Sequence, residues 1–235
     1  MTIEVHPSAV VHPGAQLADG CVIGPYAVIE KDVSLGAGVY VGSHAVLGKD
    51  PQLGAASTAK SESPLPQLVI GGGSRIGAHV VICRGARLGR SVIVGDGALI
   101  RERAAIGDNA VIGSHVVVEN DVSIGDRTKI QTKAYITALT TVESDVFIAP
   151  CVITTNDNFM GRTEERFKYK GGPKIMRGAR VGAGVVILPN IVIGRDAFIA
   201  AGSIVTRDAP EGMLSMGAPA KPVRPVNEKE RLSKQ

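Results

Sequence analysis

An aliphatic residue recurs at every sixth position along most of this 235-residue chain. The pattern forms three runs, and two irregular segments separate them. Because the spacing never changes within a run, we expect the runs to build one repeating structure rather than separate domains. The repeated positions are Val5, Val11, Leu17, Ile23, Ile29, Leu35, Val41 and Leu47, then every sixth residue from Ile70 to Ile148, and every sixth residue from Ile175 to Val205.

A six-residue period excludes an amphipathic helix. Six helical steps of about 100° turn each successive aliphatic residue by about 240°, which scatters these residues around the axis. A single half-buried strand is excluded too, because Asp, Lys, Pro and Gly recur two and four places further on, where a strand face needs apolar residues. The pattern therefore predicts a short strand and a turn in each hexad, with three hexads closing a triangular coil.

The remaining hexad positions agree with this prediction. Counting the aliphatic residue as the first, the fifth place nearly always holds a small residue, as the inside of a tight corner requires. The fourth place is usually Gly, Asn, Asp or His, which tolerate a positive φ at a turn. His44, His79 and His115 all fall on this fourth place, so a turn role is the simplest interpretation of each.

Hexads such as Ile106-Gly107-Asp108-Asn109-Ala110-Val111 resemble the repeat of left-handed parallel β-helix acyltransferases. This resemblance implies an all-β, left-handed parallel β-helix solenoid of about nine coils of 18 residues, with two extruded loops. The expected domain spans residues 1–224, its loops lie at about 53–69 and 158–174, and 225–235 form a polar C-terminal tail.

Composition narrows the range of functions. The net charge of +4 suits anionic ligands, but the basic residues are scattered and only 3% of residues are aromatic, which argues against nucleic-acid binding. No apolar run approaches a membrane span and no leader pattern is present, so we expect a cytoplasmic protein without membrane insertion. The three cysteines lack zinc-site spacing, and we expect no metal requirement.

Departures from the repeat mark candidate functional positions. Residues 18 apart share a corner, so His115, Lys133 and Cys151 should form one column. Arg103, Asp121, Leu139 and Asp157 should form a second column. The second irregular segment is densely charged, which makes it a candidate site, although both segments could also brace neighbouring subunits. His115 is a candidate base or substrate contact, with a turn residue as the alternative.

Two further stretches refine the resemblance. Gly125-Asp126-Arg127-Thr128-Lys129-Ile130-Gln131, followed by Thr155-Asn156-Asp157, is similar to bacterial N-acetyltransferases that act on nucleotide-linked amino sugars for surface polysaccharides. The resemblance implies that Asn156 and Asp157 orient or deprotonate the amine. It also implies substrate contacts by Arg127, Gln131 and Lys133, in a site formed between the subunits of a homotrimer.

The C-terminal stretch from Ala200 to Asp208, with Gly217-Ala218-Pro219-Ala220-Lys221 after it, resembles the coenzyme A end of hexapeptide acetyltransferases. The resemblance implies acetyl-CoA as the acyl donor. It places Ala183, Ala201 and Thr206 along the pantetheine arm, and Lys221 and Arg224 near the nucleotide and its phosphates. Tight coil packing and a simple chain terminator are the alternatives for these segments.

Other reactions stay open at this point. No histidine follows His115, whereas galactoside and maltose relatives place a catalytic histidine near Thr155-Asn156-Asp157, so transfer to an amine is favoured over transfer to a hydroxyl. Thr132 and Lys133 replace two asparagines of the amino-sugar group. Alternatives are a sugar O-acetyltransferase, a lipid A type acyltransferase, a γ-type carbonic anhydrase and a non-catalytic assembly module.

Overall fold

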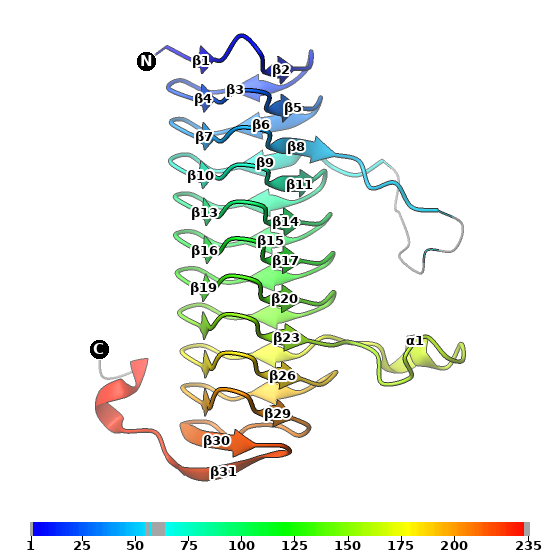
Figure 1. The fold of residues 1–235 in the computed structure, drawn as a ribbon, viewed down its shortest axis with the longest axis vertical. Helices are drawn as coiled ribbons and strands as arrows, with labels where there is room; N and C mark the ends of the chain where they lie inside the picture. The colour runs from blue at the N-terminus through cyan, green and yellow to red at the C-terminus, as the bar shows by residue number, and fades with distance from the viewer. Residues whose placement is uncertain (1, 55–56, 58–63, 233–235) are drawn as a thin grey trace.

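The computed structural model describes residues 2–54, 57 and 64–232. Over these residues the chain winds into a triangular prism of stacked coils (Figure 1), with one sheet on each face. All neighbouring strands in the coils are parallel, as the six-residue period predicts. Sheet A is β1 (Glu4–Val5), β4 (Val22–Ile23), β7 (Tyr40–Val41), β10 (Arg75–Ile76), β13 (Ile93–Val94), β16 (Val111–Ile112), β19 (Lys129–Ile130), β22 (Phe147–Ile148), β25 (Arg180–Val181), β28 (Phe198–Ile199), β30 (Met213–Gly217) and β31 (Ala220–Pro225).

The other two faces follow the same order along the chain. Sheet B is β2 (Val10–Val11), β5 (Val28–Ile29), β8 (Val46–Lys49), β11 (Val81–Cys83), β14 (Leu99–Ile100), β17 (Val117–Val118), β20 (Tyr135–Ile136), β23 (Ile153–Thr154), β26 (Val186–Ile187) and β29 (Ile204–Val205). Sheet C is β3 (Gln16–Leu17), β6 (Val33–Leu35), β9 (Leu68–Ile70), β12 (Arg87–Leu88), β15 (Ala105–Ile106), β18 (Ser123–Ile124), β21 (Thr141–Val142), β24 (Lys174–Ile175) and β27 (Val192–Ile193).

The solenoid is slightly longer than predicted. Among the described residues, sheet A has twelve strands, of which β31 is antiparallel, so eleven parallel levels remain, against the nine coils expected. Within this part of the chain, nine complete coils run from β1–β3 to β25–β27, and β28, β29 and β30 add incomplete coils at the C-terminal end. The hairpin of β30 and β31 then covers the C-terminal end (Figure 1).

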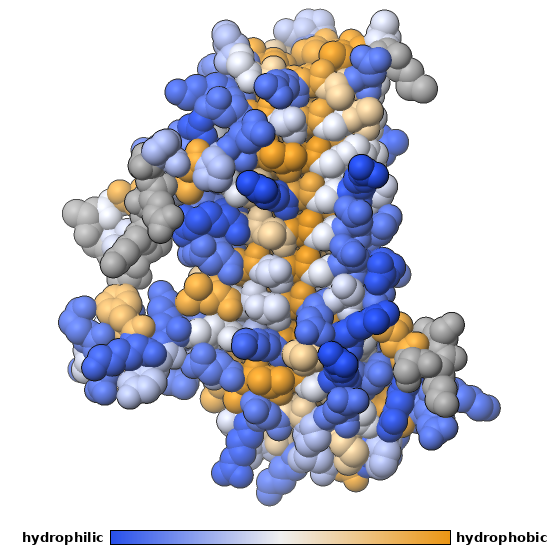
Figure 2. All heavy atoms as spheres, turned by 180° about the vertical axis from the view of Figure 1, so that it is seen from behind, coloured by the Kyte–Doolittle hydropathy of each residue, from blue (hydrophilic) through white to orange (hydrophobic). Residues whose placement is uncertain are grey.

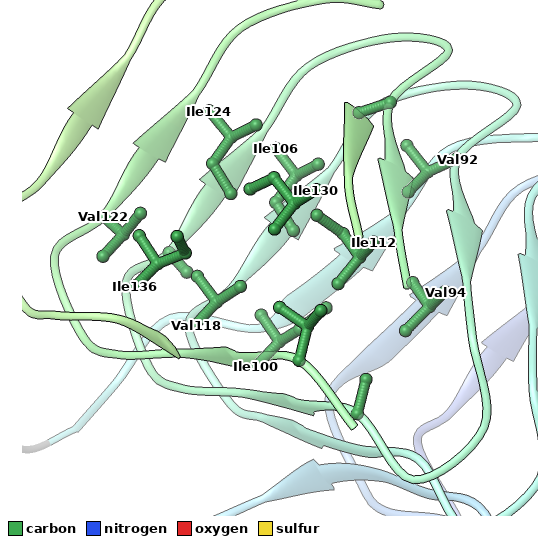
Figure 3. Close-up of a cluster of buried hydrophobic side chains, with 14 of the residues drawn as sticks. Val92, Val94, Ile100, Ile106, Ile112, Val118, Val122, Ile124, Ile130 and Ile136 are labelled. Atoms are coloured by element: carbon green, nitrogen blue, oxygen red, sulfur yellow. The ribbon is translucent and has the colours of Figure 1, made fainter. Parts of the chain in front are cut away.

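The repeated aliphatic residues fill the inside of the prism. Ile112, Ile130 and Ile148 stack on one another through β16, β19 and β22, and all three are fully buried. Figure 3 shows equivalent columns pointing inward from the other two sheets. Seen from behind, hydrophilic side chains flank a narrow hydrophobic band along the solenoid (Figure 2).

The three edges of the prism are named here by the sheets that they join. The AB corner contains residues 25–26, 43–44, 78–79, 96–97, 114–115, 132–133, 150–151, 183–184 and 201–202. The BC corner contains residues 84–85, 102–103, 120–121 and 138–139, and the CA corner contains residues 108–109, 126–127, 144–145, 177–178, 195–196 and 211–212. The second residue of each pair usually has a positive φ, including His44 (57°), His79 (56°) and His115 (56°), which confirms the prediction for the fourth place.

Both loops leave the solenoid at the BC corner (Figure 1). The first spans residues 50–67, because Leu68 and Val69 already pair with β6, two residues before the predicted end of the loop. The second spans residues 155–173 and contains the helix α1 (Arg166–Tyr169). Within the described residues, no helix has the length and apolarity needed to cross a membrane.

Candidate functional site

The AB corner carries the predicted column of His115, Lys133 and Cys151. All three have a positive φ, and their side chains are exposed. The backbone N–H of Lys133 donates to the carbonyl of Ser114, and that of Cys151 donates to Thr132, so successive turns are locked together. A Cβ at Gly97 would lie 2.5 Å from Nδ1 of His115, so the imidazole covers that glycine one coil earlier. Gln131 lies just before the same corner.

The same corner continues toward the C-terminus as a row of small residues. Ala183 and Ala201 are exposed, and the Gly202 N–H donates to the Ala183 carbonyl at 2.8 Å. A Cβ at Gly182 would approach the Ala201 nitrogen to 2.5 Å, so this part of the corner is also tightly packed. Within the described part of the chain, the backbone N–H groups of Ala183 and Ala201 donate to no acceptor. They are therefore free to bind a ligand.

The remaining residues predicted for coenzyme A lie at this end of the solenoid. Thr206 directly follows β29 and is exposed. Lys221 and Arg224 are exposed on the terminal strand β31, where they pair with Met216 and Leu214 of β30. The structure thus gathers two basic side chains at the end of the solenoid toward which the row of small residues runs.

The BC corner carries the second predicted column as an ion pair. Arg103 donates to both carboxylate oxygens of Asp121, at 2.6 and 2.8 Å, and Asn120 donates to one of them. The hydrogen bonds from Arg103 lower the pKa of the Asp121 carboxyl below its usual value, against the opposing effect of partial burial. Asp121 is therefore ionised at neutral pH.

Beside this corner, a groove of about 560 Å³ lies between the outer face of sheet B and the second loop. Arg101 bridges the buried Glu102 (2.9 Å) and Glu119 (3.0 Å), so much of the charge in the groove is balanced internally. The groove also offers aromatic and amide groups to a ligand. Its lining includes Arg101, Arg103, Glu119, Tyr135, Asn156, Phe167 and Lys170.

Asn156 and Asp157 begin the second loop but face different surroundings. Asn156 lines the groove, and its amide donates to the Ala138 carbonyl at 3.3 Å. The Asp157 carboxylate accepts hydrogen bonds from the N–H groups of Phe159 and Gly161. It also forms an ion pair with Arg166 at 3.0 Å. Burial acts to raise the pKa of the Asp157 carboxyl, but these donors together hold it below its usual value. This geometry anchors the loop and leaves Asp157 poorly suited to accept a proton.

Within one chain, the structure does not bring all predicted site residues together. His115, Gln131 and Lys133 lie on the AB corner, whereas Asn156 and Asp157 lie on the BC corner. Arg127 lies on the third, CA corner, where it donates to both carboxylate oxygens of Asp145, at 2.6 and 3.0 Å. It is therefore remote from both groups.

Several groove residues were not identified from the sequence. Arg101 and Glu119 are 18 residues apart and oppositely charged, a signal that could have revealed their pairing across adjacent coils. Phe167 and Lys170 reach the groove only because the second loop folds back over it, and no periodic signal marks them. Among the residues described, no three His, Cys, Asp or Glu side chains are arranged to hold a metal ion.

The outward-facing strand positions of sheet B are apolar along the whole sheet. Several of its side chains remain markedly exposed, including Val10 (48%), Ile153 (44%) and Ile204 (40%). The equivalent positions of sheet C are mixed and include Gln16, Arg87, Ser123 and Lys174. The outward residues of sheet B are Val10, Val28, Val46, Val81, Leu99, Val117, Tyr135, Ile153, Val186 and Ile204.

Comparison with known proteins supports the repeat architecture. Residues 103–138 and 172–207 match the bacterial transferase hexapeptide (six repeats) family, and residues 5–103 match the GMPPB C-terminal domain. The solved UDP-N-acetylglucosamine acyltransferase from Campylobacter jejuni is similar over 94% of this chain and 74% of its own, with a TM-score of 0.60 and 22% identity. At that identity, the similarity concerns the fold.

Curated relatives match shorter segments. A putative acetyltransferase of Schizosaccharomyces pombe is 46% identical over 46 residues, which is 20% of this chain and 22% of that protein. A serine acetyltransferase of Buchnera aphidicola is 40% identical over 74 residues, which is 32% of this chain and 27% of that protein. The matches thus span about a quarter of these relatives. Together with the stacked hexads, these matches show that the chain carries the hexapeptide repeat of bacterial transferases and has the left-handed parallel β-helix fold of such acyltransferases.

Proposed function

We propose that the protein transfers an acetyl group from acetyl-CoA to the amine of a nucleotide-linked amino sugar used for surface polysaccharides. It would act as a cytoplasmic homotrimer with its sites between subunits. The hexapeptide repeat and the segments shared with acetyltransferases support the acyl transfer. The amine acceptor rests on the resemblance of the 125–131 and 155–157 segments to amino-sugar N-acetyltransferases.

One observation carries the proposal. The predicted site residues lie in two groups, one on the AB corner and one on the BC corner, and these corners are the two edges of sheet B, whose outward strand positions are apolar. An exposed apolar face of this length favours association. If three copies turn sheet B toward a common axis, each copy presents its AB corner to one neighbour and its BC corner to the other. The trimer would then bring His115 and Lys133 of one subunit next to Asn156 of the next.

The donor fits the row of small residues on the AB corner. Ala183 and Ala201 leave room for a thin pantetheine arm, and their free backbone N–H groups can donate to its amides or to the thioester oxygen. Thr206 can add a hydroxyl contact. Lys221 and Arg224 can pair with phosphate oxygens at the C-terminal end.

The acceptor would occupy the groove beside the BC corner. Its neutral amine attacks the thioester carbonyl carbon, a C–N bond forms, and the C–S bond breaks to release the CoA thiolate. His115 can take the proton that the nitrogen loses, and Asn156 can orient the nitrogen from the groove. Lys133 and Gln131 can contact sugar or phosphate oxygens. Asp157 contributes by holding the second loop in place.

A second candidate is O-acyl transfer to a nucleotide sugar. The exposed imidazole of His115 favours it, since a hydroxyl acceptor needs a base. The fold is also similar to that of the Campylobacter jejuni UDP-N-acetylglucosamine acyltransferase. The two reactions predict different acceptors, a sugar amine or a sugar hydroxyl, and can be compared directly.

The test is a thiol-release assay with acetyl-CoA and matched nucleotide sugars that carry either an amine or a hydroxyl at the same carbon. Release with the amino sugar alone supports the proposal, and release with the hydroxyl sugar alone supports the second candidate. Absence of turnover with either, together with no rise in melting temperature on adding CoA, would contradict both.

A further inference from the structure

A second pocket lies at the C-terminal end of the CA corner, far along the chain from the groove. Its volume is about 280 Å³. Three successive coils place Arg177, Arg195 and Glu211 at the same turn position. The Asp196 N–H donates to the Arg177 carbonyl, and the Gly212 N–H donates to the Arg195 carbonyl, which aligns these turns. The lining consists of Arg177, Arg195, Asp196, Glu211, Gly212, Arg231 and Leu232.

The pocket is closed by the C-terminal tail, which returns along the solenoid after β31 (Figure 1). Val226 is buried and donates its N–H to the Gly212 carbonyl at 2.8 Å. Glu230 forms an ion pair with Arg180 at 3.0 Å, and the Leu232 N–H donates to the Asp196 carboxylate at 2.9 Å. The tail therefore docks through a few specific contacts rather than through a broad apolar surface.

The pocket is lined by three guanidinium groups and two carboxylates, and the Leu232 N–H already donates to Asp196. Arg177 is paired with Asp145 at 3.0 Å, outside the pocket lining. In the described part of the chain, the Arg195 side chain has no hydrogen-bond or ion-pair partner. Nε of Arg231 is shielded from solvent and has no partner among the described residues, whereas Nη2 of the same side chain donates to the Gly212 carbonyl at 3.5 Å.

A shielded arginine donor without an acceptor, such as Nε of Arg231, is unusual, because each unmade hydrogen bond of a charged group is costly. The exposed side chain of Arg195 lines the same pocket. A guanidinium offers paired N–H donors that match the oxygens of a phosphate group. We propose that this pocket binds a phosphate-type oxyanion between Arg195 and Arg231, which clamps the returning tail onto the CA corner.

This site is separate from the proposed acetyl-CoA path and does not depend on it. The row of small residues lies on the AB corner, on the other side of sheet A from the pocket. A connection exists through the chain, since β31 carries Lys221 and Arg224 and leads directly into the tail. An anion bound in the pocket would therefore order the segment that follows these two basic residues.

The experiment has two readouts, amide hydrogen exchange over residues 226–232 and ligand affinity by calorimetry at constant ionic strength. Each is measured with inorganic phosphate and, separately, with UDP. Arg195→Ala tests the pocket without removing a structural contact, and Arg231→Ala tests the tail side. Arg207→Ala is the matched control, because Arg207 is exposed on the last coils but does not line the pocket.

We expect ligand-dependent slowing of exchange in the tail of the wild type and of Arg207→Ala. Losing one charge-assisted hydrogen-bond donor should weaken binding about tenfold or more in Arg195→Ala and Arg231→Ala. Equal affinity for phosphate and UDP would identify a free phosphate site, and tighter binding of UDP would identify a nucleotide site. Absence of binding in both arms, or unchanged affinity in Arg195→Ala, would overturn the proposal.

Discussion

Arg166 and Asp157 lie nine residues apart in the chain, and their ion pair of 3.0 Å ties the short helix α1 to the base of the second loop. Arg166 is buried, so the ion pair with Asp157 compensates for the desolvation of its guanidinium group. The contact fixes the side of the groove from which Phe167 and Lys170 reach inward.

The first prediction concerns the pH dependence of this anchor. The folded-state pKa of Asp157 is lowered, so its stabilising effect is fully present above the unfolded value of about 3.9 and is lost as the pH falls through the folded pKa. Asp157→Asn should lower the melting temperature at neutral pH, and its curve should converge with that of the wild type below about pH 4. Glu164→Gln is the control, because Glu164 is exposed in the same loop. A difference that stayed constant down to low pH would argue against the ionic anchor.

The second prediction concerns the apolar outer face of sheet B. Val117→Asp places a carboxylate in the middle of the proposed subunit interface, where burial of an unpaired charge is costly. We expect light scattering after gel filtration to report monomers for this variant and trimers for the wild type. Ser123→Asp, on the outer face of sheet C, should remain trimeric. Trimers of Val117→Asp would show that sheet B is not the interface.

The third prediction separates Lys133 from Arg127. Lys133 is exposed on the AB corner, and loss of its charged contact should raise the KM for the acceptor about tenfold in Lys133→Ala. Arg127 is bound to Asp145 on the remote CA corner, so Arg127→Ala should leave KM within about twofold of the wild type. Steady-state kinetics on both purified variants checks this, and the opposite ranking would contradict the placement of the acceptor.

The fold was largely predictable because each hexad repeats the same pattern of one strand and one turn. The burial of Ile112 and Ile130 and their pairing across 18 residues follow directly from the period. The first loop, predicted at about 53–69, ends at residue 67, since Leu68 and Val69 rejoin sheet C before the aliphatic position at Ile70.

The site was less predictable. The columns of His115 and Asp121, and their places on different corners, followed from the period. The ion pair of Asp157 with Arg166 and the tail contact of Leu232 with Asp196 are long-range contacts of irregular segments. No repeat constrains such segments, so only the structure reveals them.

The central claim, a site shared between neighbouring subunits, is tested most directly by mixing two inactive variants, His115→Ala and Asn156→Ala. In every mixed trimer one interface joins an intact His115 to an intact Asn156, so random assembly of equal amounts should restore about a quarter of wild-type activity. The measurement is acetyl transfer by co-expressed variants, compared with each variant alone. Recovery near this level supports the shared site, and mixtures as inactive as the separate variants would contradict it.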